Sequence, residues 1–584
     1  MTATRLPPGA PAPCRHGASI ALKKKSMNSF RPIKTAKALM PVFAILLCFG
    51  RAAVAEGTRP NVLFIISDDQ ERREFNFLPE GRDEAGKPRN LSPNLDRLAR
   101  EGVVLLNQYV TSPVCTPSRF SVLTGTYASR SSNFERTVKN NGQVNITWNC
   151  HIDPETPNLA RTLQQAGYFT GAVGKNHVIE VKGVGRGGPA DDADPNDPVV
   201  AAYYARKQQK LVAAFKACGF DFAANLYQGN LPGHTCKALE FHNMDWITSG
   251  ALSFLDEWKE TDKPFFLYMA TTLNHGPGPR YKKYTGNPLA TPAGLLKRPL
   301  SVQPARKTIP QRVKEAGLAG QPTACDVLWL DDGIGAVLDK LEAMNALDNT
   351  IVFFFDDHGV EKGKGSPYEG GIKSVSLVWS PKYIKGGRQS KVNIANIDFA
   401  PTIMDLCGVP KESQPTVDGK SFVPVLRGSE EEIHDVLFFE IGATRAVLKD
   451  GWKYLAFRLP ASLPPNPPKP YTHLADRPGG RGSEGPAKSF YPNYYDKDQL
   501  YNIASDPLER KNLFGDRSQQ KRVRQMQQLL REAVARVPGT FAELTSEQPA
   551  VHSVRAFGDP AQSRKMKEAK RAARRAEKAQ RGKQ

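Results

Sequence analysis

Polar side chains with catalytic or metal-binding capacity follow four apolar runs of the chain, at 61–66, 168–173, 264–270 and 351–355. The residues that follow these runs are Asp68 and Asp69, Lys175 and His177, His275, and Asp357 and His358. Carboxylates are the ligands that hard divalent cations prefer, and imidazole can bind a metal or move a proton. Each of these short motifs alone also fits a turn or a surface position. Because such polar residues follow all four apolar runs, the sequence predicts that they form a catalytic or metal-binding site.

A fifth cluster, Cys115-Thr116-Pro117-Ser118-Arg119, could supply a nucleophile. Pro117 suits the first turn of a helix, so Cys115 is expected at a helix N-terminus. The helix dipole and the free N–H groups favour an anion there. Arg119 adds a permanent cation whose planar fork matches oxyanions. Taken alone, the motif favours a buried structural cysteine in front of a helix over a nucleophile.

The elements that must position these residues form an alternating pattern. The four apolar runs do not alternate with polar residues, which indicates strands covered on both faces, as in a largely parallel sheet. Amphipathic helical patterns lie between and after them, at 92–100, 157–166, 245–259 and 326–344. The pattern predicts an α/β fold, a large mixed, mostly parallel sheet sandwiched by helices. Ligands of such sheets gather outside the carboxyl ends of the strands, so we expect the polar clusters to meet there.

A smaller C-terminal α+β subdomain of antiparallel strands is expected after the sandwich. Short β-type runs at 436–439, 445–448 and 452–455, with a Lys449-Asp450-Gly451 turn, predict the strands, and 516–537 predicts a helix. We expect a catalytic domain at 56–430, this subdomain at 431–545 and a basic tail at 546–584. Loops at 182–198 and 276–325 should rim the pocket, whereas 458–493 is either a surface excursion or a substrate loop.

The net charge of +21 does not indicate a nucleic-acid-binding face. Nine basic and no acidic residues lie in 1–55, and ten basic against two acidic residues lie in 564–584. The intervening part is nearly balanced, with 61 basic and 57 acidic residues. No nucleic-acid partner is therefore expected.

The first 55 residues resemble a secretory signal peptide. Lys34 and Lys37 precede the apolar run 38–50, and Ala53-Val54-Ala55 fits a cleavage site. The run is short for a membrane span, although an N-terminal anchor is the alternative, and Met27 is an alternative start. We expect an exported protein, periplasmic or extracellular, with no stable membrane span after the signal is removed. Six cysteines would remain, with one or two disulfides and at least one free thiol.

The motifs together resemble those of the type I sulfatases, which belong to the alkaline-phosphatase-like superfamily. The Cys115–Arg119 motif with Ser121-x-Leu123-Thr124-Gly125 is similar to the signature of that family. The Asp pair, Gly-Lys-x-His, the later His, Asp-His-Gly and Glu369-Gly370-Gly371-Ile372-Lys373 follow in the family's order. Residues 499–513 are also similar to the C-terminal motif of the family, so the resemblance runs from about Arg59 to about Gly515.

The resemblance implies a covalent sulfuric ester hydrolase. Cys115 would be oxidised by a formylglycine-generating enzyme, and one hydroxyl of the hydrated aldehyde would attack sulfur. Asp68, Asp69, Asp357 and His358, with residue 115, would bind one divalent cation, Ca²⁺ or alternatively Mg²⁺. His358 stands where the family often has Asn.

The resemblance also implies roles for the remaining site residues. Arg119 and Lys175 would hold the hydrate, with Lys373 adding positive charge for the sulfate. His177 would take the proton that releases sulfate. His275 and Lys373 would protonate or stabilise the leaving oxygen.

The substrate class is inferred from the expected export and not from a sequence motif. A sulfated carbohydrate is expected, because an exported enzyme meets such polymers, with aryl sulfates, sulfamates and small sulfate esters as alternatives. Two other functions remain open at this point. One is a phosphatase or phosphonate ester hydrolase of the same superfamily, and the other is a noncatalytic protein that binds sulfated glycans.

Overall fold

The structure is a computed structural model that describes residues 59–184, 188–231, 233–276, 283–458, 490–494 and 496–544. The expected signal peptide at 1–55 and the basic tail at 546–584 lie outside these residues, as does most of 458–493. None of the described helices has both the length and the apolar character needed to cross a membrane.

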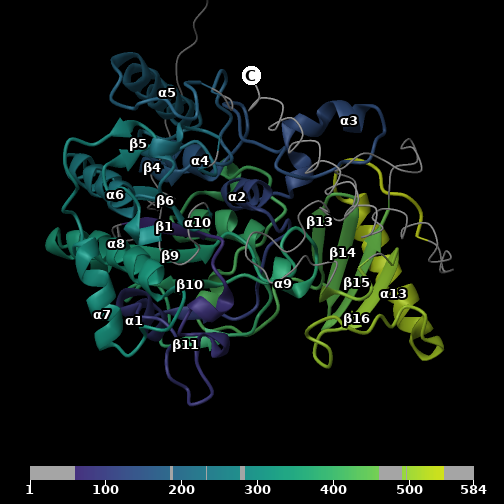
Figure 1. The fold of residues 1–584 in the computed structure, drawn as a ribbon. Helices are drawn as coiled ribbons and strands as arrows, with labels where there is room; N and C mark the ends of the chain where they lie inside the picture. The colour runs from purple at the N-terminus through teal and green to yellow at the C-terminus, as the bar shows by residue number, and fades with distance from the viewer. Residues whose placement is uncertain are drawn as a thin grey trace, which may run out of the picture. The chain divides into compact units, whose positions relative to one another are not determined.

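An eight-stranded sheet organises the larger part of the chain (Figure 1). Its order is β11 (Arg388–Ser390), β2 (Val103–Leu105), β10 (Ser376–Trp379), β9 (Thr350–Asp356), β1 (Asn61–Asp68), β6 (Phe265–Asn274), β4 (Phe169–Lys175) and β5 (Phe222–Tyr227). β10 runs antiparallel to both of its neighbours, and the other pairings are parallel. The expected mixed, mostly parallel sheet is confirmed, and the four apolar runs form four consecutive strands of it, β9, β1, β6 and β4.

Helices cover both faces of this sheet because its strands are apolar on both sides. In β1, Val62, Phe64 and Ile66 join one hydrophobic core, whereas Leu63 and Ile65 join the other. Successive side chains of a strand point to opposite faces, so an unbroken apolar run serves two cores. The helices of the first core are α2 (Cys115–Thr124), α4 (Leu159–Gln165), α5 (Pro198–Ala217) and α10 (Phe399–Leu406). Those of the second are α1 (Pro93–Glu101), α6 (Met244–Trp258), α7 (Ile309–Glu315) and α8 (Ala324–Ala343).

Local capping explains where several of these helices begin. The side chain of Asn158 accepts a hydrogen bond from the backbone of α4, and Asn243 does the same for α6. The start of α1 is capped from a distance, because the carboxylate of Asp331 in α8 accepts the N–H groups of Asn94 and Leu95 at 3.0 and 2.8 Å. This contact also holds α1 against α8.

A second, four-stranded antiparallel sheet follows the sandwich (Figure 1). Its order is β13 (Leu437–Ile441), β14 (Thr444–Lys449), β15 (Trp452–Phe457) and β16 (Asp498–Asn502), and α13 (Gln520–Ala535) packs on it through Val523, Met526 and Leu530. The expected antiparallel strands and helix are therefore present. The remaining short elements are α3 (Glu135–Lys139), α9 (Glu369–Ile372), α11 (Val423–Leu426), β3 (Gln108–Tyr109), β7 (Ala290–Thr291), β8 (Gly294–Leu295) and β12 (Ile394–Ala395).

Candidate active site

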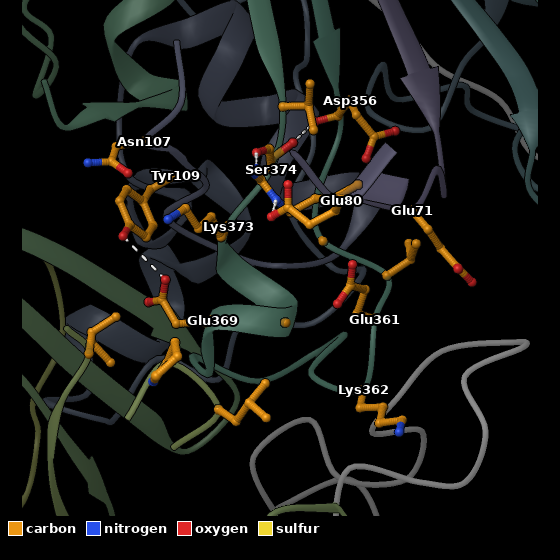
Figure 2. A pocket seen from close by; sticks show the side chains of 18 of the residues that line it. Glu71, Glu80, Asn107, Tyr109, Asp356, Glu361, Lys362, Glu369, Lys373 and Ser374 are labelled. Carbon is orange, nitrogen blue, oxygen red and sulfur yellow. Dashed lines mark hydrogen bonds and ion pairs between the residues drawn. The ribbon is translucent and has the colours of Figure 1, made fainter. Parts of the chain in front are cut away.

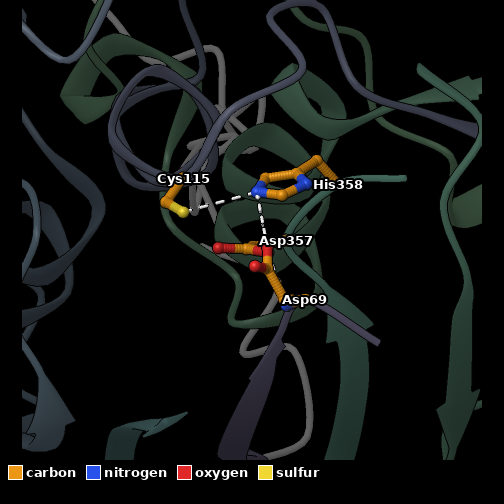
Figure 3. A group of neighbouring side chains, drawn as sticks. All are labelled: Asp69, Cys115, Asp357 and His358. Atoms are coloured by element: carbon orange, nitrogen blue, oxygen red, sulfur yellow. Dashed lines mark hydrogen bonds and ion pairs between the residues drawn. The ribbon is translucent and has the colours of Figure 1, made fainter. Parts of the chain in front are cut away.

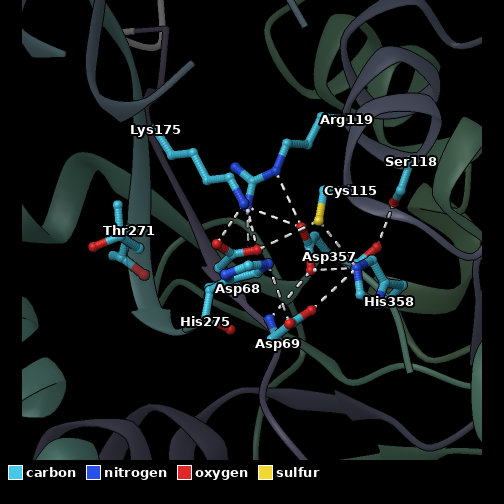
Figure 4. Close-up of polar contacts among 12 residues, drawn as sticks. Asp68, Asp69, Cys115, Ser118, Arg119, Lys175, Thr271, His275, Asp357 and His358 are labelled. Atoms are coloured by element: carbon cyan, nitrogen blue, oxygen red, sulfur yellow. Dashed lines mark hydrogen bonds and ion pairs between the residues drawn. The ribbon is translucent and has the colours of Figure 1, made fainter. Parts of the chain in front are cut away.

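The carboxyl ends of four neighbouring strands bring the polar clusters together (Figure 4). β9, β1, β6 and β4 are consecutive neighbours in the sheet, so Asp357, Asp68, His275 and Lys175 emerge at one edge. Cys115 opens α2 at the same edge and is 1% exposed. The expected helix start at Cys115 is thus present, with Pro117 in the first turn.

A compact group of potential ligands forms the centre of the site (Figure 3). One ligand atom from each of Asp69, Cys115, Asp357 and His358 lies within 4.8 Å of all the others. Nε2 of His358 is 3.3 Å from Sγ of Cys115 and 3.4 Å from an oxygen of Asp69 and an oxygen of Asp357. Asp68 adds a further carboxylate, 3.8 Å from the same sulfur. Three converging carboxylates and one imidazole fit a hard divalent cation.

Three cationic side chains surround these carboxylates. Nζ of Lys175 lies 2.5 Å from Asp68, and the guanidinium of Arg119 donates to Asp357 at 3.0 and 3.1 Å. Lys364 is paired with Asp69. Arg119 is wholly buried, and one of its terminal nitrogens, Nη1, has no hydrogen-bond partner within the described residues. That nitrogen is a donor available to an anionic ligand, because a buried donor without a partner is costly.

The cations change the chemistry of Cys115. Burial alone raises the pKa of its thiol, but the ammonium groups of Lys175 and Lys364 outweigh that effect and lower the pKa to about 6. A thiol with this pKa is mostly thiolate at neutral pH. The position therefore favours an anionic oxygen or sulfur on residue 115.

The histidines of the site have opposite protonation preferences. Burial disfavours the charged form of His358, yet Asp357 beside it raises its pKa to about 9. Burial, Lys175 and Arg119 together hold the pKa of His177 well below its ordinary value, and its Nδ1 has no hydrogen-bond partner among the described residues. His177 is thus a neutral imidazole at neutral pH. His275 contacts Asp69, with Nε2 3.4 Å from the carboxylate.

Lys373 does not join this group. It follows α9, its backbone bridges to that of Tyr109, and its ammonium lies 5.8 Å from the centre of the Tyr109 ring (Figure 2). Lys364, which was not among the expected site residues, is the lysine that lies beside Asp69. The reason is a compact loop, since the N–H of Gly359 bonds to the carbonyl of Gly371 and a side chain on Gly363 would strike the backbone of Gly371.

The glycines around Lys364 could have indicated its place in the site, but the family motif order drew attention to Lys373 instead. Lys364 and Lys373 both follow Asp357-His358, and both stand next to glycine-rich segments. The glycines on each side of Lys364, Gly363 and Gly365, indicate a close backbone approach, which is what brings this lysine back to the site.

Other supporting residues carry no sequence signal. The side chain of Asn396 accepts the N–H of Thr111 and donates to the carbonyl of Ser118, which fixes the segment around Cys115. His242 is buried beside the site, with Nδ1 2.8 Å from the hydroxyl of Thr272. Asn396 and His242 lie far in sequence from the residues they contact and belong to no recognisable motif, so the sequence alone did not indicate their roles.

The cysteines of the described chain are all free thiols, Cys115, Cys150, Cys218, Cys236, Cys325 and Cys407. The expectation of one or two disulfides is therefore not met. Five of the six are buried, and burial raises the pKa of Cys150, Cys218 and Cys407, so these thiols are poorly reactive. Cys115 differs from them by having ammonium groups beside it.

Comparison with known proteins decides the family. A family model described as sulfatase matches residues 60–409, which include every residue of the site. The chain belongs to the sulfatase family. Sulfatases are sulfuric ester hydrolases, so the expected enzyme class is confirmed.

Relatives of this sulfatase include enzymes named for sulfated amino sugars. It is 28% identical over 404 residues to human N-acetylglucosamine-6-sulfatase, which covers 65% of this chain and 67% of the relative. It is 24% identical over 537 residues to an N-acetylgalactosamine-6-O-sulfatase of Bacteroides thetaiotaomicron, covering 78% and 89%. The solved phosphonate monoester hydrolase of Agrobacterium radiobacter has the same alkaline-phosphatase-like fold, with a TM-score of 0.52, 19% identity, and coverage of 82% of this chain and 96% of that one.

Proposed function

We propose that this sulfatase is an exported enzyme that removes sulfate from sulfated carbohydrate, with residue 115 as a formylglycine nucleophile beside one divalent cation. The observation that carries the proposal is the surroundings of Cys115. Its sulfur lies 3.3 Å from His358 and 3.8 Å from Asp68, in a buried position where Lys175 and Lys364 favour negative charge. A structural cysteine needs none of these groups.

The ligand set supports a calcium site, with magnesium as the alternative. Asp68, Asp69, Asp357 and His358 would hold the cation together with residue 115. A bound cation would lower the pKa of a hydroxyl on residue 115 and offset the charge of the sulfate group. Oxygen donors predominate, which is the preference of Ca²⁺ and Mg²⁺ rather than of softer metals.

Residue 115 and the side chains around it have separate roles in attack on sulfur, binding of the sulfate and proton transfer. Oxidised to formylglycine and hydrated, residue 115 supplies two hydroxyls, one to attack sulfur and one whose deprotonation expels sulfate. Arg119 and Lys175 hold the attacking group and the sulfate oxygens, as their positions next to Asp357 and Asp68 allow. His177, a neutral imidazole, takes the proton during expulsion.

We assign protonation or stabilisation of the leaving oxygen to His275 and Lys364. Both contact Asp69 and therefore lie on the same side of the ligand group. We assign to Lys364 the role that was expected for Lys373, because Lys364 is paired with a metal-ligand candidate and Lys373 faces Tyr109. Protonation of the departing alkoxide is the general-acid contribution to ester cleavage.

Sulfated amino sugars are the substrates to test first, because two relatives are named for the 6-sulfates of N-acetylglucosamine and N-acetylgalactosamine. Sulfate release from both 6-sulfates should be measured with protein matured in a host that makes the formylglycine-generating enzyme. Mass spectrometry of the tryptic peptide Glu101–Arg119 should find the thiol replaced by an aldehyde. An unmodified thiol in fully active protein would overturn the formylglycine assignment.

Aryl sulfate and aryl phosphate compared under the same conditions separate this function from its alternatives. A sulfatase should prefer the sulfate. Preference for phosphate or phosphonate esters would indicate the related hydrolases. Tight binding of sulfated glycan by matured protein without any sulfate release would instead indicate the noncatalytic binding protein.

A further inference from the structure

A cavity of about 910 Å³ lies next to the metal-ligand group without being lined by its members (Figure 2). Gln70 and Glu71, which follow Asp69, form part of its wall, as do Asp356 and Gly359, which flank Asp357-His358. The two segments that carry the candidate ligands thus present neighbouring residues to this cavity. Its volume falls within the range of about 300–1,000 Å³ typical of small-molecule sites.

The opposite wall comes from the C-terminal sheet and the segments next to it. Leu448, Tyr491, Ile503 and Leu508 provide an apolar surface, and Leu508 is 57% exposed. An apolar wall facing a polar floor suits a ligand with one apolar face and several polar groups, such as a sugar ring.

Four basic residues line the cavity, and their partners differ. Arg72 pairs with Glu80 at 2.9 Å and donates to the carbonyl of Ser374, and Arg73 pairs with Glu71. The ammonium of Lys362 lies 4.5 Å from the centre of the Phe490 ring.

Lys373, like Lys362, is partly buried and has no ion pair or hydrogen bond within the described residues. Its ammonium lies 5.8 Å from the centre of the Tyr109 ring. Burial lowers the pKa of its ammonium, and Arg72 adds to this effect, whereas the carboxylates of Glu369 and Glu80 oppose it without reversing it. A bound anion would act in the same direction as these carboxylates.

No ion pair joins Lys373 to a carboxylate of the cavity within the described residues. Glu369 pairs with Lys453 at 3.0 Å and accepts the hydroxyl of Tyr109 at 3.3 Å. Asp356 accepts hydrogen bonds from the hydroxyl of Ser67 and the N–H of Gln70. Glu361 is exposed. Lys362 and Lys373 are therefore the two cations of the cavity without an ion pair within the described residues, and Glu361 interacts electrostatically with Lys362.

We propose that this cavity binds a monoanionic sugar, with the anionic group on Lys373 and the ring against the apolar wall. Glu369 and Asn107 line the same cavity and are labelled with Lys373 in Figure 2. Their side chains can accept and donate hydrogen bonds to ring hydroxyls. The anionic group is the carboxylate of a uronate or a sulfate ester. Only the origin of such a sugar in an acidic polysaccharide rests on the proposed function, because binding itself requires no turnover.

Calorimetric titration of the full chain with D-glucuronate, D-glucose 6-sulfate and D-glucose tests the proposal. At least one of the two acidic sugars should bind at least ten-fold more tightly than glucose. Binding by glucuronate alone would assign the carboxylate, and binding by the 6-sulfate alone would assign the sulfate ester. Equal binding of all three, or saturable binding of none, would overturn the proposal.

Variants separate this cavity from the metal site. Lys373→Met should weaken binding of the acidic sugar at least ten-fold, and Lys373→Arg should retain part of it. Ala504→Trp should obstruct the cavity from an exposed wall position without removing a charge, and it should also abolish binding. Lys297→Met, at an exposed lysine, is the matched control and should bind normally.

Lys364→Met changes the metal site, so it should leave binding of glucuronate in the cavity intact. If Lys364→Met abolishes that binding while Lys373→Met and Ala504→Trp retain it, the ligand occupies the metal site and the proposal is wrong. Binding that persists in a preparation unable to release sulfate supports the cavity and counts against the proposed function alone.

Discussion

The ammonium of Lys453 lies 2.6 Å from the carboxylate of Glu509, and both side chains are wholly buried. Lys453 belongs to β15 of the C-terminal sheet, and its ammonium also lies 3.0 Å from Glu369 of α9. Glu509 in turn accepts the N–H of Glu369. The C-terminal sheet thus holds α9, whose glycines pack on the loop that carries Lys364.

Replacement of Lys453 should therefore destabilise the protein strongly. Lys453→Met leaves Glu369 and Glu509 buried without their counter-ion, and breaking a buried pair in this way costs about 3–5 kcal/mol of unfolding free energy. Urea unfolding measures the effect. Lys411→Met, which removes an exposed pair with Asp405, is the control and should cost less than about 1 kcal/mol. Equal losses in both variants would contradict the role of the buried pair.

The pH dependence of the free energy of unfolding should also reflect the raised pKa of the Glu509 carboxyl. Burial, partly offset by Lys453, raises the pKa of its carboxyl to about 7 in the folded protein, against about 4.3 when unfolded. Between these values the folded state binds more protons, so the contribution of this group to stability falls as pH rises. The stability of wild type relative to Glu509→Gln should therefore fall between pH 4.5 and 7. A relative stability that rises with pH would contradict this shift.

The reactivity of Cys115 should distinguish Lys364 from Lys373. In unmatured, metal-free protein, alkylation of Cys115 should be half-maximal near pH 6, the pKa to which Lys175 and Lys364 lower the buried thiol. Lys364→Met should move this midpoint to higher pH, because a nearby positive charge that favours the thiolate is lost. Lys373→Met, the matched control, should leave it unchanged. Mass spectrometry of the peptide Glu101–Arg119 at each pH gives the profile.

Turnover should depend on Lys364 as well. Lys364→Ala should lower kcat for a sulfated substrate about 10²–10³-fold, the usual effect of removing one charge-stabilising donor. Lys297→Ala, at an exposed position, should leave kcat unchanged. The folded content of both variants is compared by circular dichroism. A Lys364→Ala enzyme with near-normal kcat would remove this lysine from the reaction.

Binding of a divalent cation should stabilise the folded protein. Chelation should lower the Tm, and added Ca²⁺ should restore it, because a ligand that binds only the folded state stabilises it. Asp69→Asn should weaken or abolish the response to Ca²⁺. Asp339→Asn, at an exposed position of α8, is the control and should respond as wild type does. An unchanged response in Asp69→Asn would exclude this carboxylate from the metal site.

Much of the fold could be predicted because its signals are local. The apolar runs around Phe64 and Phe353 identify strands buried on both faces, and the Ser92-Pro93 start and the periodicity around Leu95 identify a helix. Parallel strands share one carboxyl edge, so the meeting of Asp68, Lys175, His275 and Asp357 also follows from local pattern and general topology.

The residue types at the metal-ligand group and the position of Cys115 at a helix N-terminus were determined by the sequence itself, because each depends on a short contiguous motif. That Lys364, and not Lys373, lies beside the carboxylates was decided only by tertiary structure, since it depends on how the glycine-rich loop packs against α9 and the distant Lys453. The cavity beside the site has the same origin. Its walls come from segments hundreds of residues apart, and no local pattern encodes where such segments meet.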